Sequence, residues 1–267
     1  MRLNIFLCLL FILVACAKNN TNESRASGTP SPDAFSSSAL QTAYQKYQEQ
    51  RSDTLPAYQV REAGKLYPVD QAPRDTAFFV FREQLREAVR QRNIFPIMEA
   101  LHPEVKVSFG SEYGPEGFIE IWGLQSEEQT VQSNLWTVLG RVLDSGGVFQ
   151  NGGKTFIAPY VFATWPDSED AFDRAAITGA GVRVRSQPNL QSRIITSLSY
   201  DIVDFIQRTD QELTIDNETH NWMKIRTLDG QEGFAWGKYV ASPIGYRAGF
   251  ERQPDGQWLM TFFLAGD

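Results

Sequence analysis

The chain has 267 residues, and its 32 Asp and Glu side chains outnumber 25 Lys and Arg, which gives a formal net charge of −7 at pH 7. A chain this acidic is not expected to bind nucleic acid, and charge alone would not attract it to anionic lipid headgroups. It contains only 2 His and 2 Cys, so chemistry that needs several of these side chains together has few residues to use.

Residues 1–15 have the pattern of an export signal. Arg2 supplies a positive charge, and residues 5–14 form an unbroken apolar run that is too short to span a bilayer, where about 20 residues are needed. The run ends in Leu-Val-Ala-Cys at Cys16, which resembles the bacterial lipoprotein processing box. The alternative is an ordinary signal peptide with a coincidental cysteine. The place of Cys16 at the end of the apolar run favours lipidation.

The resemblance to the lipoprotein box implies export and attachment to a membrane through lipid on Cys16. Ala17-Lys18 follows that cysteine in place of the aspartate that signals retention, which favours the outer membrane over the inner one in a cell with two membranes. Cys8 leaves with the signal. The mature protein is therefore expected to have neither a free thiol nor a disulfide, although it lies outside the cytoplasm.

Residues 16–74 are predicted to be a tether. Asn, Thr, Ser, Gly and Pro dominate the stretch to about residue 38, and such a composition cannot bury enough apolar area to fold. A short polar helix is predicted over residues 39–50. Several prolines and little periodicity follow, over residues 52–73.

Residues 75–175 are predicted to form an α+β domain. Asp75 can cap a helix that runs to about residue 92 with one apolar face. Further elements are predicted from periodicity and turn signals: helices at 94–101, after Gly114-Pro115, and at 129–143, a strand at 105–109, and a hairpin of 147–150 with 155–162. The domain is large enough to bury its own core.

Residues 176–242 alternate between short apolar strands and turns. Strands are predicted at 182–185, 192–198, 202–205, 222–226 and 233–236, with an Asp-Gly hairpin signal at 229–230, a helical turn at 237–240 and a polar loop at 207–221. Short strands divided by turn signals indicate a small antiparallel barrel.

The segments VRVRSQPNLQS, LSYD, NWMKI, DGQEGFAW and GKYV follow one another in this stretch. In this order they resemble the bacterial SH3-type domain family over roughly residues 177–242, with Gly233-Phe234 where the family usually has Gly-Trp or Gly-Tyr. The resemblance implies a binding module, often for peptidoglycan or a peptide in envelope proteins, although such domains also serve as spacers.

The candidate ligand-binding residues are near the expected groove of the barrel: Tyr200, Asp201, Trp222, Trp236 and Tyr239. Exposed aromatic rings there could stack on a sugar or a peptide. The alternative is that Trp222 and Trp236 fill the small core of the barrel, which is expected for at least one of them. Tyr200 and Asp201 are the better candidates for an exposed site.

Residues 243–267 are predicted to be a last hairpin, with strands at 246–250 and 257–264 around Pro-Asp-Gly. A lone hairpin is unstable in water, so it is expected to join the sheet of the α+β domain and make the barrel an insertion. The alternative is that it extends the barrel. From about residue 76 to the end, VSFGSEYGPEGF, TFIAPYVFATWP and YRAGFERQPDGQWLMTFFLAGD resemble an uncharacterised family of SH3-bearing bacterial lipoproteins, which implies architecture and location but no activity.

Few catalytic classes remain open. A cysteine peptidase needs a thiol with a histidine, and an acylated Cys16 offers none. A zinc site or a Ser-His-Asp triad would have to use His102 or His220, which lie in different predicted regions. Gly152-Gly153-Lys154-Thr155 lacks the first glycine of a phosphate loop and sits on a hairpin. No metal and no cofactor are expected.

Pairs of carboxylates could still serve a glycosidase as acid and base. The pairs are Glu112 with Glu116, and a cluster of Asp167, Glu169 and Asp170. Helix capping and solvated loops are the simpler explanation. The sequence therefore predicts a lipid-anchored envelope protein that binds peptidoglycan or an envelope protein through its barrel and has no catalytic activity. The alternatives are a carboxylate-dependent cell-wall hydrolase and a purely structural or inhibitory lipoprotein.

Overall fold

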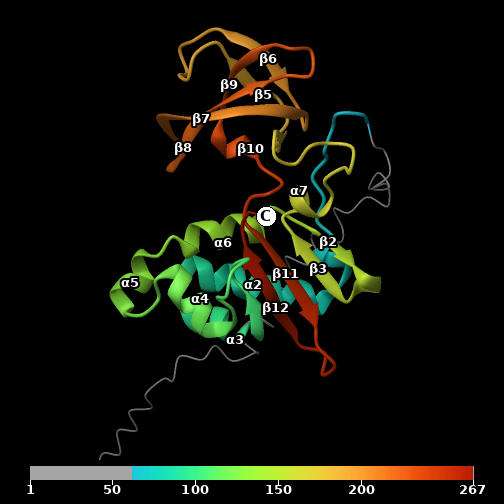
Figure 1. The fold of residues 1–267 in the computed structure, drawn as a ribbon, viewed down its shortest axis with the longest axis vertical. Coiled ribbons are helices and arrows are strands. Elements are labelled where there is room, and N and C mark those ends of the chain that lie inside the picture. Colours follow the sequence, from blue (N-terminus) through green and yellow to red (C-terminus); the bar gives the residue numbers. More distant parts are fainter. Residues whose placement is uncertain (1–61, 267) are drawn as a thin grey trace, which may run out of the picture.

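The computed structural model describes residues 62–266, whose strands form two sheets (Figure 1). Figure 1 shows one sheet with most of the helices at one end of the long axis and a curled sheet at the other. The predicted mixture of an α+β part and a small SH3-like sheet is confirmed. The curled sheet is an antiparallel half-barrel, because the first and last strands of its spatial order are not neighbours and the barrel is not closed.

The first sheet has five strands. In spatial order they are β1 (Leu101–Lys106), β12 (Trp258–Leu264), β11 (Arg247–Arg252), β3 (Thr155–Ala158) and β2 (Val148–Gln150). All neighbouring pairs are antiparallel except β1 with β12, which is parallel. The short η3 turn (Asn151–Gly153) joins β2 to β3.

Helices pack on the first sheet and share its core. Asp75 accepts a hydrogen bond from the Phe78 backbone N–H at 2.9 Å, as predicted for the cap of the first long helix. Buried residues from α2, α4, α6, β3, β11 and β12 form one cluster, in which Phe78, Phe118 and Phe250 are fully buried. The helices are α2 (Thr76–Gln91), α3 (Ile94–Glu99), α4 (Gly114–Trp122), α5 (Glu127–Gln132) and α6 (Leu135–Asp144).

The helix predicted over residues 129–143 is two helices. The backbone leaves the helical region at Ser133 (φ −58°, ψ 139°). The Ser133 hydroxyl donates to the Trp122 carbonyl at 2.6 Å and accepts from the Leu135 N–H at 3.2 Å. Serine side chains compete with helical backbone bonds in this way, so α6 begins afresh at Leu135.

Two predicted strands have different ends in the structure. The strand expected at 105–109 is β1, which begins earlier and ends at Lys106, and the Ser108 hydroxyl instead donates to Glu112 at 2.7 Å. The strand expected to reach residue 162 ends at Ala158, because Pro159 follows and opens the short helix α7 (Tyr160–Ala163). Proline removes a backbone donor, so strands commonly end there.

The C-terminal hairpin joins the first sheet, as predicted. Ala248 of β11 lies opposite Phe263 of β12 and Ala158 of β3. The half-barrel is therefore inserted between strands that pair with each other, and the alternative in which the hairpin extends the barrel is wrong. Gly249 is needed at this point of β11, because an added Cβ would lie 2.1 Å from the Phe262 ring.

The half-barrel has seven antiparallel strands around a small core that contains Val184, Val203 and Ile225. The turn η4 (Gly237–Tyr239) precedes its last strand, as the sequence predicted. In spatial order the strands are β10 (Val240–Ala241), β4 (Arg174–Ile177), β7 (Ile202–Ile215), β8 (Glu218–Arg226), β9 (Glu232–Trp236), β5 (Val182–Arg185) and β6 (Ile194–Leu198).

The polar segment 207–221 is not a loop. It forms the distal half of the β7–β8 hairpin, in which Ile215 lies opposite Glu218. The two residues between them, Asp216 (φ 51°) and Asn217 (φ 64°), both have left-handed backbone conformations. A two-residue loop of this kind matches the twist of the two strands, and the Asp-Asn dipeptide is the sequence signal for it.

Residues 62–71, which we call the strap, are part of the fold and not of the predicted tether. The Leu66 N–H donates to the Tyr200 carbonyl at 2.7 Å on one side, and the Gly147 N–H donates to the Val69 carbonyl at 3.0 Å on the other. Leu66 is buried. The strap therefore links the half-barrel to the first sheet. The last residues of the predicted tether also belong to the fold, as the short turn η2 (Ala72–Arg74). Residues 1–61, with the predicted signal, Cys16 and most of the predicted tether, lie outside the described residues.

A small hydrophobic cluster lies between the two sheets. Leu66 of the strap and Tyr160 and Val161 of α7 pack with Ala176 and Ile202 of the half-barrel. The cluster fixes the half-barrel against α7. No helix among the described residues is both long and apolar enough to cross a membrane.

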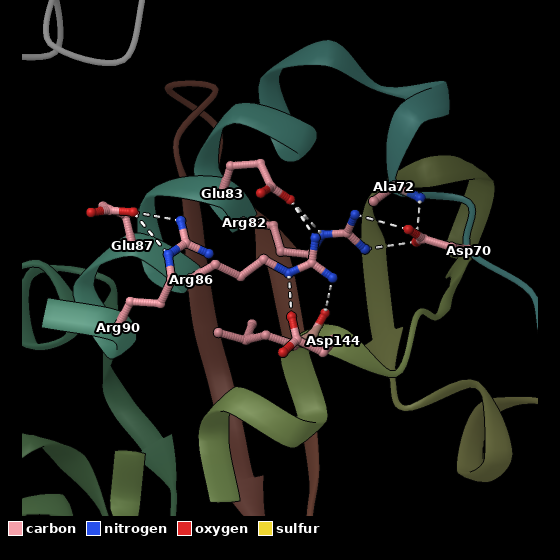
Figure 2. A network of polar contacts seen from close by, with 9 residues as sticks. Asp70, Ala72, Arg82, Glu83, Arg86, Glu87, Arg90 and Asp144 are labelled. Atoms are coloured by element: carbon pink, nitrogen blue, oxygen red, sulfur yellow. Dashed lines mark hydrogen bonds and ion pairs between the residues drawn. The ribbon is translucent and has the colours of Figure 1, made fainter. Parts of the chain in front are cut away.

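An arginine network holds the strap to helix α2 (Figure 2). The guanidinium of Arg82, a buried residue, donates to both carboxylate oxygens of Asp70, at 2.7 and 2.8 Å. Asp70 also accepts from the Ala72 N–H at 3.1 Å. One turn along α2, Arg86 donates to the Leu143 carbonyl at 2.7 Å and pairs with Asp144 at 2.9 Å. The strap and α6 are thus both tied to α2.

Candidate ligand-binding cleft

Tyr200 and Asp201, the residues predicted to form an exposed site, lie under the strap. The Lys65 ammonium pairs with the Asp201 carboxylate at 2.7 Å and donates to the Ser199 carbonyl at 3.0 Å. The Tyr200 ring lies 5.4 Å from that of Tyr67. Both predicted residues therefore have partners in the strap and are only partly exposed.

Trp222 is only 2% exposed and Trp236 is 7% exposed. They lie opposite each other on β8 and β9, and they point away from the Ile225 and Ala235 side of the sheet, because side chains alternate along a strand. The Trp236 indole N–H donates to the Leu213 carbonyl at 3.0 Å, and its ring meets the His220 ring edge-on at 5.0 Å. As a candidate ligand contact Trp222 is corrected, because it is buried, although it does not belong to the barrel core that the alternative assigned to it.

Tyr239 is the most exposed of the four predicted aromatic residues, at 36%. Its ring lies 5.9 Å from the Trp236 ring. The Lys238 ammonium lies 5.8 Å from the Trp236 ring centre and 6.0 Å from that of Tyr239, and it pairs with Glu218 at 2.7 Å. We call Trp236, Lys238 and Tyr239 the aromatic edge.

A cleft of about 830 Å³ opens beside the aromatic edge, between the half-barrel and helix α6. Polar side chains enter it from both sides, with Glu218, His220 and Lys238 on the half-barrel and Arg141 and Asp144 on α6. Its apolar lining includes Pro68, Val138, Val142, Val161 and Val240. Figure 1 shows α6 and α7 between the first sheet and the half-barrel, where this cleft lies.

Two residues that line the cleft carry donors without a partner in the described part of the chain. Arg141, an exposed residue, forms no ion pair among the residues that the structure describes. Tyr160 is 4% exposed, and its hydroxyl has no hydrogen-bond partner within the described part of the chain. Burial raises the pKa of Tyr160 above its ordinary value, so its hydroxyl keeps its proton at neutral pH.

The histidine in the cleft has an altered acidity. Burial lowers the pKa of His220 below its ordinary value, the positive charges of Arg141 and Lys238 lower it further, and Glu218 opposes them. Arg141 belongs to α6 and Glu218 to the same strand as His220, so charges on both walls of the cleft affect the pKa of His220.

We expect the stability of the protein to fall as pH drops below about 6.5, the ordinary pKa of histidine. The unfolded chain then binds a proton at His220 more readily than the folded protein does, and stability is lost until pH reaches the lowered folded value. NMR titration of the His220 ring should give a midpoint below 6.5, and Arg141→Gln should raise it. A midpoint that Arg141→Gln leaves unchanged would contradict the proximity of these two side chains.

Three of the five carboxylates considered for catalysis have a structural role. Glu112 accepts from the Ser108 hydroxyl, which lowers the pKa of this carboxyl group. Glu169 pairs with Arg174. Asp170 accepts from the backbone N–H groups of the loop after it. None of the five, which also include Glu116 and Asp167, is among the described residues that line the cleft. His102 lies elsewhere, where it accepts from the Glu104 N–H at 3.1 Å.

The sequence did not reveal the cleft, because its walls come from α6, α7, the strap and the half-barrel. Arg141 looks like an ordinary charge on the polar face of an amphipathic helix. His220 was placed in a polar loop, whereas it lies on β8. Only the Asp-Asn turn signal, by extending the hairpin, could have moved His220 onto the sheet.

Residues 180–241 match the family model of the bacterial SH3 domain. Neither the curated proteins nor the solved structures include a match to this chain. The matched stretch contains strands β5 to β10 and η4, and the fold of that stretch is the curled antiparallel sheet described above. The half-barrel of this protein is therefore a bacterial SH3-type domain.

Proposed function

We propose that this protein is a lipid-anchored component of the bacterial cell envelope, attached to a membrane through Cys16. In this proposal its SH3-type domain binds peptidoglycan or another envelope protein, and the chain has no catalytic activity. The export signal and the position of Cys16 support the location, with the outer membrane favoured over the inner one. The match to the bacterial SH3 domain supports the binding role, because such domains commonly bind cell-wall or protein partners.

The aromatic edge is the observation that carries the binding role. Tyr239 and Lys238 are accessible beside an open cleft, whereas the strap covers Tyr200 and Asp201. An exposed aromatic ring beside a cation is suited to stack on a sugar or a peptide and to hydrogen-bond its polar groups. We therefore place the ligand at the aromatic edge, with Trp236 as its buried support.

A hydrolase is the less favoured candidate. A glycosidase acid needs a carboxyl group that holds its proton near neutral pH, which requires a raised pKa. Glu112 has the opposite shift, and Glu169 is held by an arginine. The carboxylates named from the sequence are thus better explained by loop structure than by chemistry.

Co-sedimentation with purified cell-wall sacculi tests the proposal. Residues 17–267, at near-physiological salt, are expected to be retained, and Tyr239→Ala should weaken retention about tenfold, which corresponds to about 1.4 kcal/mol. The matched control is Tyr67→Ala, which removes an exposed tyrosine from the strap. Loss of retention in both variants alike would argue against the aromatic edge. If the parent chain is not retained at all, peptidoglycan is eliminated and an envelope protein becomes the partner to identify.

A further inference from the structure

We infer that the cleft between helix α6 and the SH3-type domain binds the free carboxylate of a short peptide, with Arg141 and the Tyr160 hydroxyl as its donors. This inference deepens the proposed function, because it names the ligand chemistry of the surface beside the aromatic edge. It differs from that proposal in one respect: one wall of the site belongs to α6, outside the SH3-type domain.

The charges in the cleft leave one cation without a partner. Asp70 is held by Arg82, Asp144 by Arg86 and Glu218 by Lys238, at distances of 2.7 to 2.9 Å. Arg141 lines the same cleft, and within residues 62–266 no carboxylate pairs with it. A guanidinium matches a carboxylate in geometry and can donate two parallel hydrogen bonds to it. The charges of these three acids are thus balanced by Arg82, Arg86 and Lys238, and Arg141 remains available to an anionic ligand.

The Tyr160 hydroxyl supplies a second donor. This hydroxyl is buried and has no hydrogen-bond partner among the described residues, and Tyr160 is one of the residues that line the cleft. A buried donor left unsatisfied is unfavourable, and native proteins rarely retain one without a water or a ligand to accept from it. A carboxylate oxygen in the cleft would accept this bond, so ligand binding would relieve the unfavourable state of the free protein.

The walls of the cleft favour a peptide over a small inorganic anion. Its volume of about 830 Å³ is in the range of sites that enclose small organic ligands. Val138, Val142, Val161 and Val240 offer apolar surface that a phosphate ion would not use. The three acids at the walls, although paired, also disfavour a doubly charged phosphate more than a singly charged carboxylate.

The site can be tested by calorimetric titration of residues 17–267, which include every described contact. The probes are acetyl-Ala-Ala-Ala with a free carboxylate, the same peptide as its C-terminal amide, and inorganic phosphate. We expect the carboxylate form to bind at least tenfold more tightly than the amide and phosphate to bind no better than the amide. Arg141→Gln should weaken binding of the carboxylate form at least tenfold and leave the amide unaffected.

Two further variants separate binding from folding. Tyr160→Phe removes only the unsatisfied hydroxyl, so it should not lower the melting temperature of the parent chain, while it weakens carboxylate binding several-fold. Arg193→Gln removes an exposed arginine that does not line the cleft, and it should bind like the parent chain. Equal affinity for the carboxylate and amide peptides, no binding of either, tighter binding of phosphate, or an unchanged affinity in Arg141→Gln would each overturn the inference.

The same preparations distinguish this inference from the proposed function. Retention on sacculi that Arg141→Gln leaves unchanged, together with equal binding of the two peptides, would remove the carboxylate site and leave the wall-binding role of the aromatic edge intact. Selective binding of the carboxylate peptide without retention on sacculi would support the cleft and remove peptidoglycan as the ligand.

Discussion

Asp70→Ala is expected to lower the free energy of unfolding by about 3 kcal/mol, because it leaves the buried guanidinium of Arg82 without its counterion. Only 3% of the Arg82 side chain is exposed, and Glu83 remains as a distant partner at 3.7 Å. The value lies at the low end for buried pairs because about a third of the Asp70 side chain is accessible. Urea unfolding monitored by circular dichroism measures the change.

The same helix offers a matched control. Glu87 pairs with Arg90 on the exposed face of α2, which Figure 2 shows beside the buried pair. Glu87→Ala should change stability by less than about 1 kcal/mol, because exposed ion pairs contribute little. Limited proteolysis should cut within the strap faster in Asp70→Ala than in Glu87→Ala. Equal stability of the two variants would show that Arg82 does not depend on the strap.

Phe78→Ala is expected to cost about 3–5 kcal/mol, the range for a buried phenylalanine reduced to alanine. The Phe78 ring is fully buried, and its centre lies 4.2 Å from that of Phe156 and 4.8 Å from that of Trp258. Its loss would open a cavity where α2, β3 and β12 meet. The near-ultraviolet circular dichroism of the aromatic core should weaken together with the fall in the midpoint of unfolding.

Phe95→Ala is the comparison for this change. The Phe95 side chain is 68% exposed, so the same substitution should alter stability by no more than about 0.5 kcal/mol. A similar loss of unfolding free energy in the two variants would mean that burial of the Phe78 ring does not stabilise the core of the first sheet.

Local signals in the sequence were sufficient for much of the fold. The Asp75 cap, the apolar face of α2 and the turns of the SH3-type domain depend on neighbouring residues, and the structure contains all of them. The placement of the C-terminal hairpin followed from one physical rule, that a lone hairpin must pack on something. Pairing of Ala248 with Ala158 confirms it.

The remaining features depend on distant partners. Ser133 breaks a helix because the Trp122 carbonyl is close enough to accept a hydrogen bond from its hydroxyl, which periodicity does not reveal. The strap has the composition of a tether, yet Leu66 is buried by residues far along the chain. For the same reason the open site expected at Tyr200 is covered. The cleft could not be predicted from local signals, because Arg141 and His220 come to line one site only when helix α6 faces the SH3-type domain.

The strap also determines how the protein would respond to mechanical load. The described fold begins at the strap, so a pull on the chain before residue 62 is transmitted first to Gly64 and Leu66, which are hydrogen-bonded to the half-barrel, and to the Lys65–Asp201 pair. The bidentate Asp70–Arg82 pair lies next along the chain. Tension applied there would thus peel the strap from the SH3-type domain and expose Tyr200 and Asp201 before it reached the first sheet.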